Sequence, residues 1–173
     1  MGCGDVRSRL TRIVGLAGAL LLLVAGASSC APKTKHPAHA VLPTWTRSEI
    51  NRLKLEDSYD FIEKVEPAFQ LGDFDGDGKP DMATMIRNRS SNKVGVLILH
   101  RGSYGAHILG AGQRFGIEGD DWNWMSAWHV IPTTQLPRGL SKGTDALVVE
   151  KPESTGTALY WTGSEYGWLK WGD

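Results

Sequence analysis

Cysteine is almost missing from this sequence. The 173 residues contain two cysteines, Cys3 and Cys30, and both lie within the first 30 residues. The rest of the chain can therefore form neither a disulfide nor a metal site with cysteine ligands.

A strong charge of one sign is also lacking. The whole sequence has 19 basic and 19 acidic residues, and residues 30–173 have 16 basic and 18 acidic residues, a formal charge of −2. The chain has no basic field of the kind that binds the phosphates of nucleic acid. We therefore expect no nucleic-acid partner.

The sequence motifs of several large enzyme classes are absent as well. The chain contains no G-x-S-x-G, no H-E-x-x-H, no phosphate-binding loop and no dinucleotide-binding fingerprint. Asp120 and Asp121 are adjacent, so on a strand they would point to opposite faces and would not flank one substrate bond. These features argue against an enzyme. A periplasmic hydrolase without a known motif, using Asp120, Asp121 and His129, is the least favoured alternative.

The N-terminal apolar run, residues 13–25, is too short to span a membrane comfortably. Three arginines precede it and small residues follow it up to Cys30, an order typical of a secretory signal. The small residues 26–29 followed by Cys30 resemble the lipobox of bacterial lipoproteins. The resemblance implies that residues 1–29 are removed and that Cys30 is diacylated, with palmitate as the expected acyl group. It places the protein in the cell envelope as a lipid-anchored protein. The anchor would lie in the outer membrane of a Gram-negative cell, because Ala31 is not Asp, and otherwise on the outer face of the cell membrane.

Residues 30–43 contain three prolines and show no periodicity, which predicts a flexible tether after the lipidated terminus. Residues 44–173 are long enough for a single domain. Thr46 and Glu49 have the spacing of a capping box, which predicts a short helix over residues 47–56.

The most specific pattern in the chain is Asp-Phe-Asp-Gly-Asp-Gly-Lys-Pro-Asp at residues 73–81. Its carboxylates stand at loop positions 1, 3, 5 and 9, and Gly78 stands at position 6. Ca²⁺ takes six to eight oxygen ligands, and this spacing can direct several carboxylates at one point. Position 12 is Thr84 rather than the Glu of a helical calcium hand, and Pro80 disfavours a helix at the loop. We therefore predict that the loop joins two antiparallel strands.

Residues 72–83 resemble the calcium loop of integrin-type FG-GAP repeats, also called VCBS repeats, which are blades of β-propellers with the pattern D-x-D-x-D-G-x-x-D. The resemblance implies that the loop binds one Ca²⁺ ion in a structural role. It assigns as ligands the side chains of Asp73, Asp75, Asp77 and Asp81 and the backbone carbonyl of Lys79. The alternative is a polar turn that binds no ion.

Beyond Ala68 the patterns are those of β-strands. Residues 93–100 form a nearly continuous apolar run, typical of a central strand. Two segments repeat the order strand, polar turn, strand, Gly-Ser-Tyr turn and strand, with Asp81 and Asp145 in corresponding places. We predict a mainly β (α+β) fold with a short N-terminal helix and two four-stranded antiparallel, blade-like meanders. The meanders are either a duplicated unit or share their turn sequences by chance.

The second copy lacks the carboxylates of the first. If Asp145 takes position 9, positions 1, 3 and 5 are Pro137, Gly139 and Ser141. We therefore expect one metal site rather than two.

Tryptophan is abundant, and Trp122, Trp124 and Trp128 lie close to acidic residues. Indoles stack on sugars while carboxylates accept hydrogen bonds from hydroxyl groups, so this region is a possible ligand-binding surface. Large aromatic side chains also fill the cores of small β domains, and that interpretation is the stronger one. The favoured function is a non-enzymatic, calcium-binding envelope lipoprotein that acts as a binding or assembly module. A carbohydrate- or peptidoglycan-binding lipoprotein is the alternative.

Overall fold

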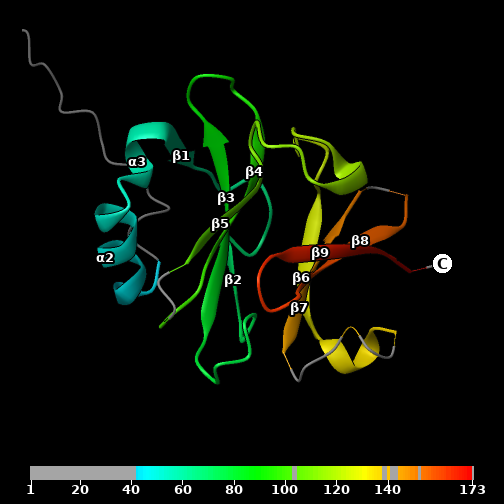
Figure 1. Cartoon of the computed structure of the whole chain (residues 1–173). Helices are drawn as coiled ribbons and strands as arrows, with labels where there is room; N and C mark the ends of the chain where they lie inside the picture. Colours follow the sequence, from blue (N-terminus) through cyan, green and yellow to red (C-terminus); the bar gives the residue numbers. More distant parts are fainter. Residues whose placement is uncertain (1–41, 103–104, 138–139, 141–143, 152, 173) are drawn as a thin grey trace, which may run out of the picture. The chain divides into compact units, whose positions relative to one another are not determined.

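The computed structural model describes residues 42–172 except 103–104, 138–139, 141–143 and 152 (Figure 1). The predicted signal segment, the lipid attachment at Cys30 and the tether up to residue 41 lie outside the described residues. Of the predicted tether, only residues 42 and 43 are described. Leu42 is buried in one cluster with Ile50 and Leu55, because its apolar side chain meets a hydrophobic surface there.

The fold is mainly β, as predicted. The described residues form two antiparallel sheets with short helical segments beside them, and both sheets stay open. The helical segments are α2 (Thr44–Arg52), α3 (Leu55–Ser58) and the 3₁₀ turns η1 (Gly116–Glu118) and η2 (Thr133–Gln135). The first sheet contains β1 (Tyr59–Phe61), β2 (Phe69–Gly72), β3 (Asp81–Asn88), β4 (Val94–Leu99) and β5 (Ala106–Gly110). The second contains β6 (Ala127–Pro132), β7 (Asp145–Glu150), β8 (Gly156–Trp161) and β9 (Tyr166–Trp171).

The two predicted meanders are both present. Strands β2, β3, β4 and β5 pair in chain order in the first sheet, and β6, β7, β8 and β9 do so in the second. The first sheet has an additional strand: β1 pairs with the end of β3 at residues 86–88, while β2 pairs with its beginning at residues 81–84. Both strands therefore share one side of β3, a feature that the sequence did not predict.

The helix begins earlier than the capping box predicts. Helix α2 starts at Thr44, and Thr46 is a buried residue of the first turn whose hydroxyl donates to the Pro43 carbonyl at 2.7 Å. The capping-box interpretation is therefore wrong, because Pro43 and not Thr46 precedes the helix. Lys54, with φ +51°, separates α2 from α3.

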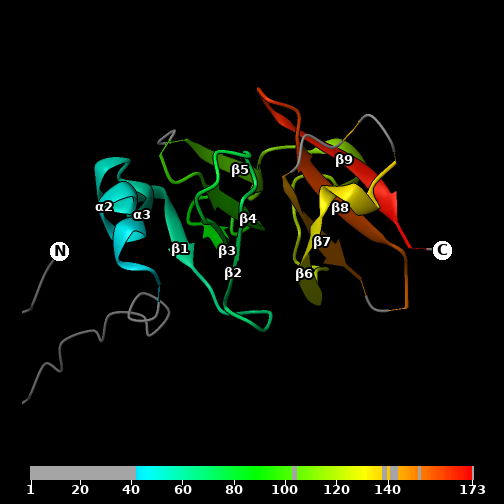
Figure 2. The same cartoon turned by 90° about the horizontal axis from the view of Figure 1, so that it is seen from below.

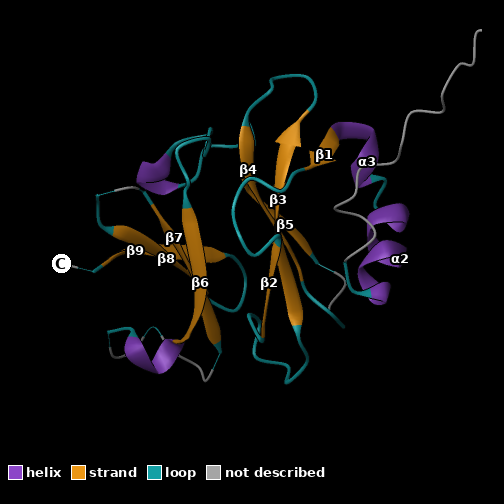
Figure 3. Cartoon of the chain, turned by 180° about the vertical axis from the view of Figure 1, so that it is seen from behind, coloured by secondary structure: helices purple, strands orange, loops and turns teal. Residues whose placement is uncertain are grey.

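The apolar run of β4 is explained by burial on both faces. Val96 and Ile98 belong to a core that also contains Leu147 and Leu159 of the second sheet. Leu97 and Leu99 belong to the core that includes Ile50 of helix α2. Figure 2 shows α2 and α3 on one side of the first sheet and β6–β9 on the other, and Figure 3 shows the same order from behind. Because successive side chains of a strand point to opposite faces, a strand in the middle layer must be apolar throughout.

Among the described residues, no helix has the length and apolar character needed to cross a membrane.

Candidate metal centre

Strands β2 and β3 hold the ends of the Asp-rich loop in register. Gly72 pairs with Asp81, so residues 73–80 are the turn of an antiparallel hairpin, as predicted. Gly76 and Gly78 both have φ +80°, in the left-handed region that favours glycine. These two glycines let the chain reverse within a short loop.

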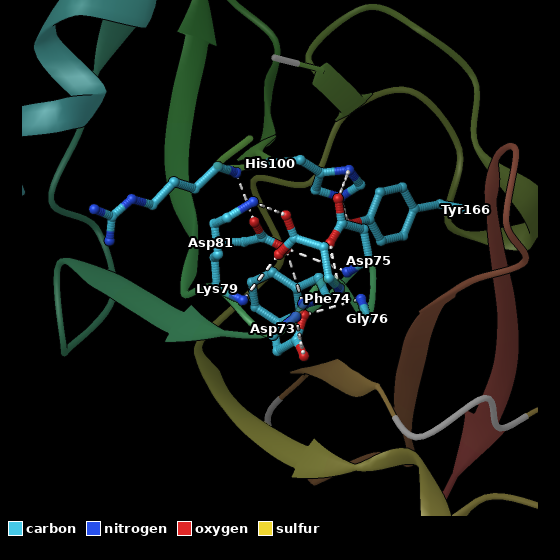
Figure 4. A network of polar contacts seen from close by, with 11 residues as sticks. Asp73, Phe74, Asp75, Gly76, Lys79, Asp81, His100 and Tyr166 are labelled. Atoms are coloured by element: carbon cyan, nitrogen blue, oxygen red, sulfur yellow. Dashed lines mark hydrogen bonds and ion pairs between the residues drawn. The ribbon is translucent and has the colours of Figure 1, made fainter. Parts of the chain in front are cut away.

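The loop brings three of the four predicted carboxylates together. Asp73, Asp75 and Asp81 each offer one oxygen, and these oxygens lie within 4.8 Å of one another. Figure 4 shows the three side chains directed toward a common region. The loop supplies the first two of these carboxylates, and the first residue of β3 supplies the third.

Asp73 also organises the turn. Its Oδ1 accepts the Gly76 N–H at 2.9 Å and its Oδ2 accepts the Gly78 N–H at 3.1 Å. Short side-chain acceptors of this kind satisfy backbone donors that a turn leaves without partners. A carboxylate oxygen has more than one lone-pair site, so these bonds leave capacity for a cation.

Asp81 is fully buried, which is unusual for a carboxylate. Its Oδ2 accepts the N–H groups of Phe74 and Asp75 at 2.9 and 3.2 Å, and its Oδ1 accepts the Arg101 N–H at 2.7 Å. Burial nevertheless raises the pKa of Asp81 to about 7, and the negative charge of Asp75 contributes to this rise. The backbone hydrogen bonds act in the opposite direction but do not offset the burial of the charge.

Asp77 lies outside the converging group. Its Oδ2 forms an ion pair with the Lys79 Nζ at 2.7 Å, and this hydrogen bond lowers the pKa of Asp77 and raises that of Lys79. The ion pair forms because an exposed ammonium group finds the nearest carboxylate two residues away. The Lys79 carbonyl as a ligand stays a prediction.

The donor set fits a hard divalent cation. Carboxylate oxygens are the ligands that Ca²⁺ prefers, and three of them converge. A cation at this point would offset the repulsion between Asp75 and Asp81 and would favour the ionised form of Asp81. Asp73, Asp75 and Asp81 would hold the ion, which would supply a charged cross-link between the loop and the start of β3.

Two residues distant in sequence adjoin the site and were not predicted as part of it. His100 follows β4, is 2% exposed, and its Nε2 lies 2.6 Å from the Tyr166 hydroxyl. Its Nδ1 lies 3.6 Å from the Asp75 Oδ2. Burial and the nearby His107 lower the pKa of His100 to about 4, so the imidazole is neutral at pH 7. The contact with the Tyr166 hydroxyl gives the buried His100 ring a hydrogen-bond partner.

The tryptophan region does not form an exposed platform. Trp122 is fully buried and Trp128 is 4% exposed, and both belong to the core between the sheets. The Trp128 Nε1 donates to the Pro67 carbonyl at 2.9 Å. Trp124 is partly buried, and the Lys151 Nζ lies 4.4 Å from the centre of its ring. Trp122 and Trp128 therefore offer no free indole face on which a sugar could stack, and the core interpretation explains them.

The remaining candidate catalytic residues, Asp120, Asp121 and His129, have separate structural partners. Asp120 forms an ion pair with Lys93, and the Asp121 Oδ1 accepts the Val94 N–H at 3.0 Å. His129 lies on β6 with its Nδ1 3.7 Å from Glu150 of β7. These contacts assign all three residues to local pairs and give no reason to group them in one catalytic site.

In the second meander, the segment predicted to correspond to the metal loop ends at Asp145. Of the residues at its predicted positions 1, 3 and 5, only Pro137 is described. The Asp145 carboxylate instead accepts the Asp73 N–H at 2.9 Å, so it is used by the first loop.

Comparison of the chain with protein-family models, with curated proteins and with solved structures finds no match in any of the three.

Proposed function

We propose that the described domain is a non-enzymatic binding or assembly module whose first hairpin is stabilised by Ca²⁺. The observation that carries the proposal is the convergence of Asp73, Asp75 and Asp81, one of which is fully buried. Burying one carboxylate beside another costs folding free energy, and a bound divalent cation would offset this cost. A structural role follows because the carboxylates hold backbone groups of the loop in place.

The proposed cellular location of the module rests on the sequence. The lipobox-like segment before Cys30 supports attachment of a lipid-anchored protein to the cell envelope. In this proposal the domain acts at the membrane surface, with an envelope protein as its partner. The burial of Trp122 and Trp128 favours this function over the alternative of carbohydrate binding through those indoles.

The test is thermal unfolding by calorimetry in EDTA and in Ca²⁺. An extracytoplasmic site of this kind is expected to have a Kd on the order of 10⁻⁴ to 10⁻³ M. At about 10 mM Ca²⁺ the ion should then add about 1.4 to 2.7 kcal/mol to the free energy of unfolding. Identical unfolding curves in EDTA and Ca²⁺ would refute the proposal.

Two variants make the test specific to the loop. Asp73→Asn removes one converging carboxylate and should abolish most of the Ca²⁺-dependent increase. Asp60→Asn also removes one negative charge, but Asp60 pairs with Arg89 at the far end of β3. The Ca²⁺-dependent increase in the stability of this variant should therefore equal that of the unmodified protein. An equal loss in both variants would indicate a nonspecific effect of charge.

A further inference from the structure

The second sheet holds the first residue of the metal loop. The Asp73 N–H donates to the Asp145 Oδ2 at 2.9 Å, and the Asp145 N–H donates to the Asp73 carbonyl at 2.8 Å. Asp145 is the first residue of β7. The backbone on both sides of a converging carboxylate is therefore fixed by a residue that lies 72 positions away in the sequence.

The second sheet also reaches Asp75 through His100. Tyr166, at the start of β9, is 8% exposed, and its hydroxyl lies 2.6 Å from the His100 Nε2. The other ring nitrogen of His100, Nδ1, lies 3.6 Å from the Asp75 Oδ2, so the imidazole stands between Tyr166 and Asp75. Figure 4 shows Tyr166, His100 and Asp75 in this succession.

The loop is also packed against the second sheet by apolar contacts. Phe74, between the first two carboxylates, is fully buried in the core that contains Leu147 and Leu159. A Cβ at Gly76 would lie 2.7 Å from the Thr144 Cγ2, so the loop backbone approaches residue 144 closely. Separation of the sheets would remove these contacts together with those of Asp145 and Tyr166.

We propose that the second sheet positions the cation ligands of the loop, with Tyr166 acting on Asp75 through His100 and Asp145 acting on Asp73, so that cation binding and docking of the two sheets stabilise each other. This inference rests on the proposed calcium site. Residues that contact the metal ligands and fix their orientation contribute to the affinity for the ion although they do not touch it. The coupling is reciprocal, because any contact that raises the affinity for the cation is itself strengthened when the cation binds.

The first test compares Tyr166→Phe with Tyr160→Phe. Each variant loses one hydroxyl and no charge, and no hydrogen bond joins the Tyr160 hydroxyl to another described residue. Calorimetric titration with Ca²⁺ should give an affinity about tenfold or more lower for Tyr166→Phe. Tyr160→Phe should keep the affinity of the unmodified protein.

The thermal shift separates positioning from a general structural role. If Tyr166 only stabilised the fold, its loss would lower the melting temperature equally with and without Ca²⁺. The proposal instead predicts a smaller Ca²⁺-dependent shift in Tyr166→Phe than in Tyr160→Phe. Equal affinity and equal shifts in these two variants would overturn the coupling but not the calcium site. Absence of Ca²⁺ binding to the unmodified protein would overturn the calcium site and the coupling that rests on it.

A second pair of variants tests the other contact and does not depend on the folding of Tyr166→Phe. Asp145→Asn and Asp145→Ala both remove the negative charge, but only asparagine keeps an oxygen that can accept the Asp73 N–H. We expect Asp145→Ala to bind Ca²⁺ more weakly than Asp145→Asn. Equal affinities would overturn the role of Asp145 as a positioning residue.

Discussion

Two glycines of the metal loop provide a matched test of how closely the loop approaches the second sheet. Gly76 and Gly78 both have φ +80°, and both donate their N–H to a carboxylate oxygen of Asp73. A Cβ at residue 76 would lie 2.7 Å from the Thr144 Cγ2, whereas a Cβ at residue 78 would have nothing within 4 Å. Gly76→Ala and Gly78→Ala therefore share the backbone strain and differ in the clash.

The expected magnitudes follow from this geometry. Alanine in the left-handed region costs about 1–2 kcal/mol in each variant. Overpacking against a buried neighbour adds about 1–3 kcal/mol to Gly76→Ala alone. Thr144 is 6% exposed and its hydroxyl lies 3.4 Å from that of Thr133, so its methyl group has little room to move. The free energy of unfolding of Gly76→Ala should therefore be about 1–3 kcal/mol lower than that of Gly78→Ala.

The assay is urea unfolding followed by tryptophan fluorescence. It is performed in EDTA, so that any effect of the variants on cation binding does not enter the free energy. Comparison of the two variants cancels the cost of the positive φ. Equal free energies of unfolding would refute the close approach of Gly76 to Thr144 and the docking of the loop on the second sheet.

Three further predictions concern single residues. Trp122→Ala should lower the free energy of unfolding by about 3–5 kcal/mol, measured with urea, because Trp122 is core; unchanged stability would contradict this. The stability should fall above pH 10, because the unfolded chain ionises Tyr166 there, whereas burial raises the pKa of Tyr166 in the folded protein well above 10.0. The contribution of Tyr166 to stability is complete below pH 10. In unfolding curves measured from pH 9 to 11, Tyr166→Phe should lose less stability than the unmodified protein as the pH rises. Asp81→Asn should lower the free energy of unfolding by about 1–3 kcal/mol, because an amide NH₂ then faces a backbone N–H. In urea unfolding, this variant should also lose the increase in the free energy of unfolding that Ca²⁺ produces.

The features that the sequence predicted depend on local chemistry. The loop at residues 73–81 was recognisable because the spacing of carboxylates and glycines specifies a turn without reference to the rest of the fold. The strand character of β4 was recognisable because a layer covered on both faces needs an apolar run. The order of the two meanders followed from turns between consecutive strands.

The features that were missed depend on contacts between distant segments. Nothing near Tyr166 in the sequence indicates that its hydroxyl meets His100, and nothing near Asp145 indicates that it holds Asp73. The tryptophans were ambiguous because the same residue type fills cores and binds sugars, and only burial separates the two. The capping box failed because its pattern is short, and the helix began at an earlier residue.

The pairing of consecutive strands has a consequence for the kinetics of folding. Except for the pairing of β1 with β3, each described strand pair joins neighbours in the chain, so each sheet closes only short loops. The contact between Asp73 and Asp145 spans 72 positions, so we expect it to form late in folding, when the two sheets meet. Interactions that form after the transition state slow unfolding more than they speed folding. We therefore expect a cation bound at the loop to lengthen the lifetime of the native state while leaving its rate of formation nearly unchanged.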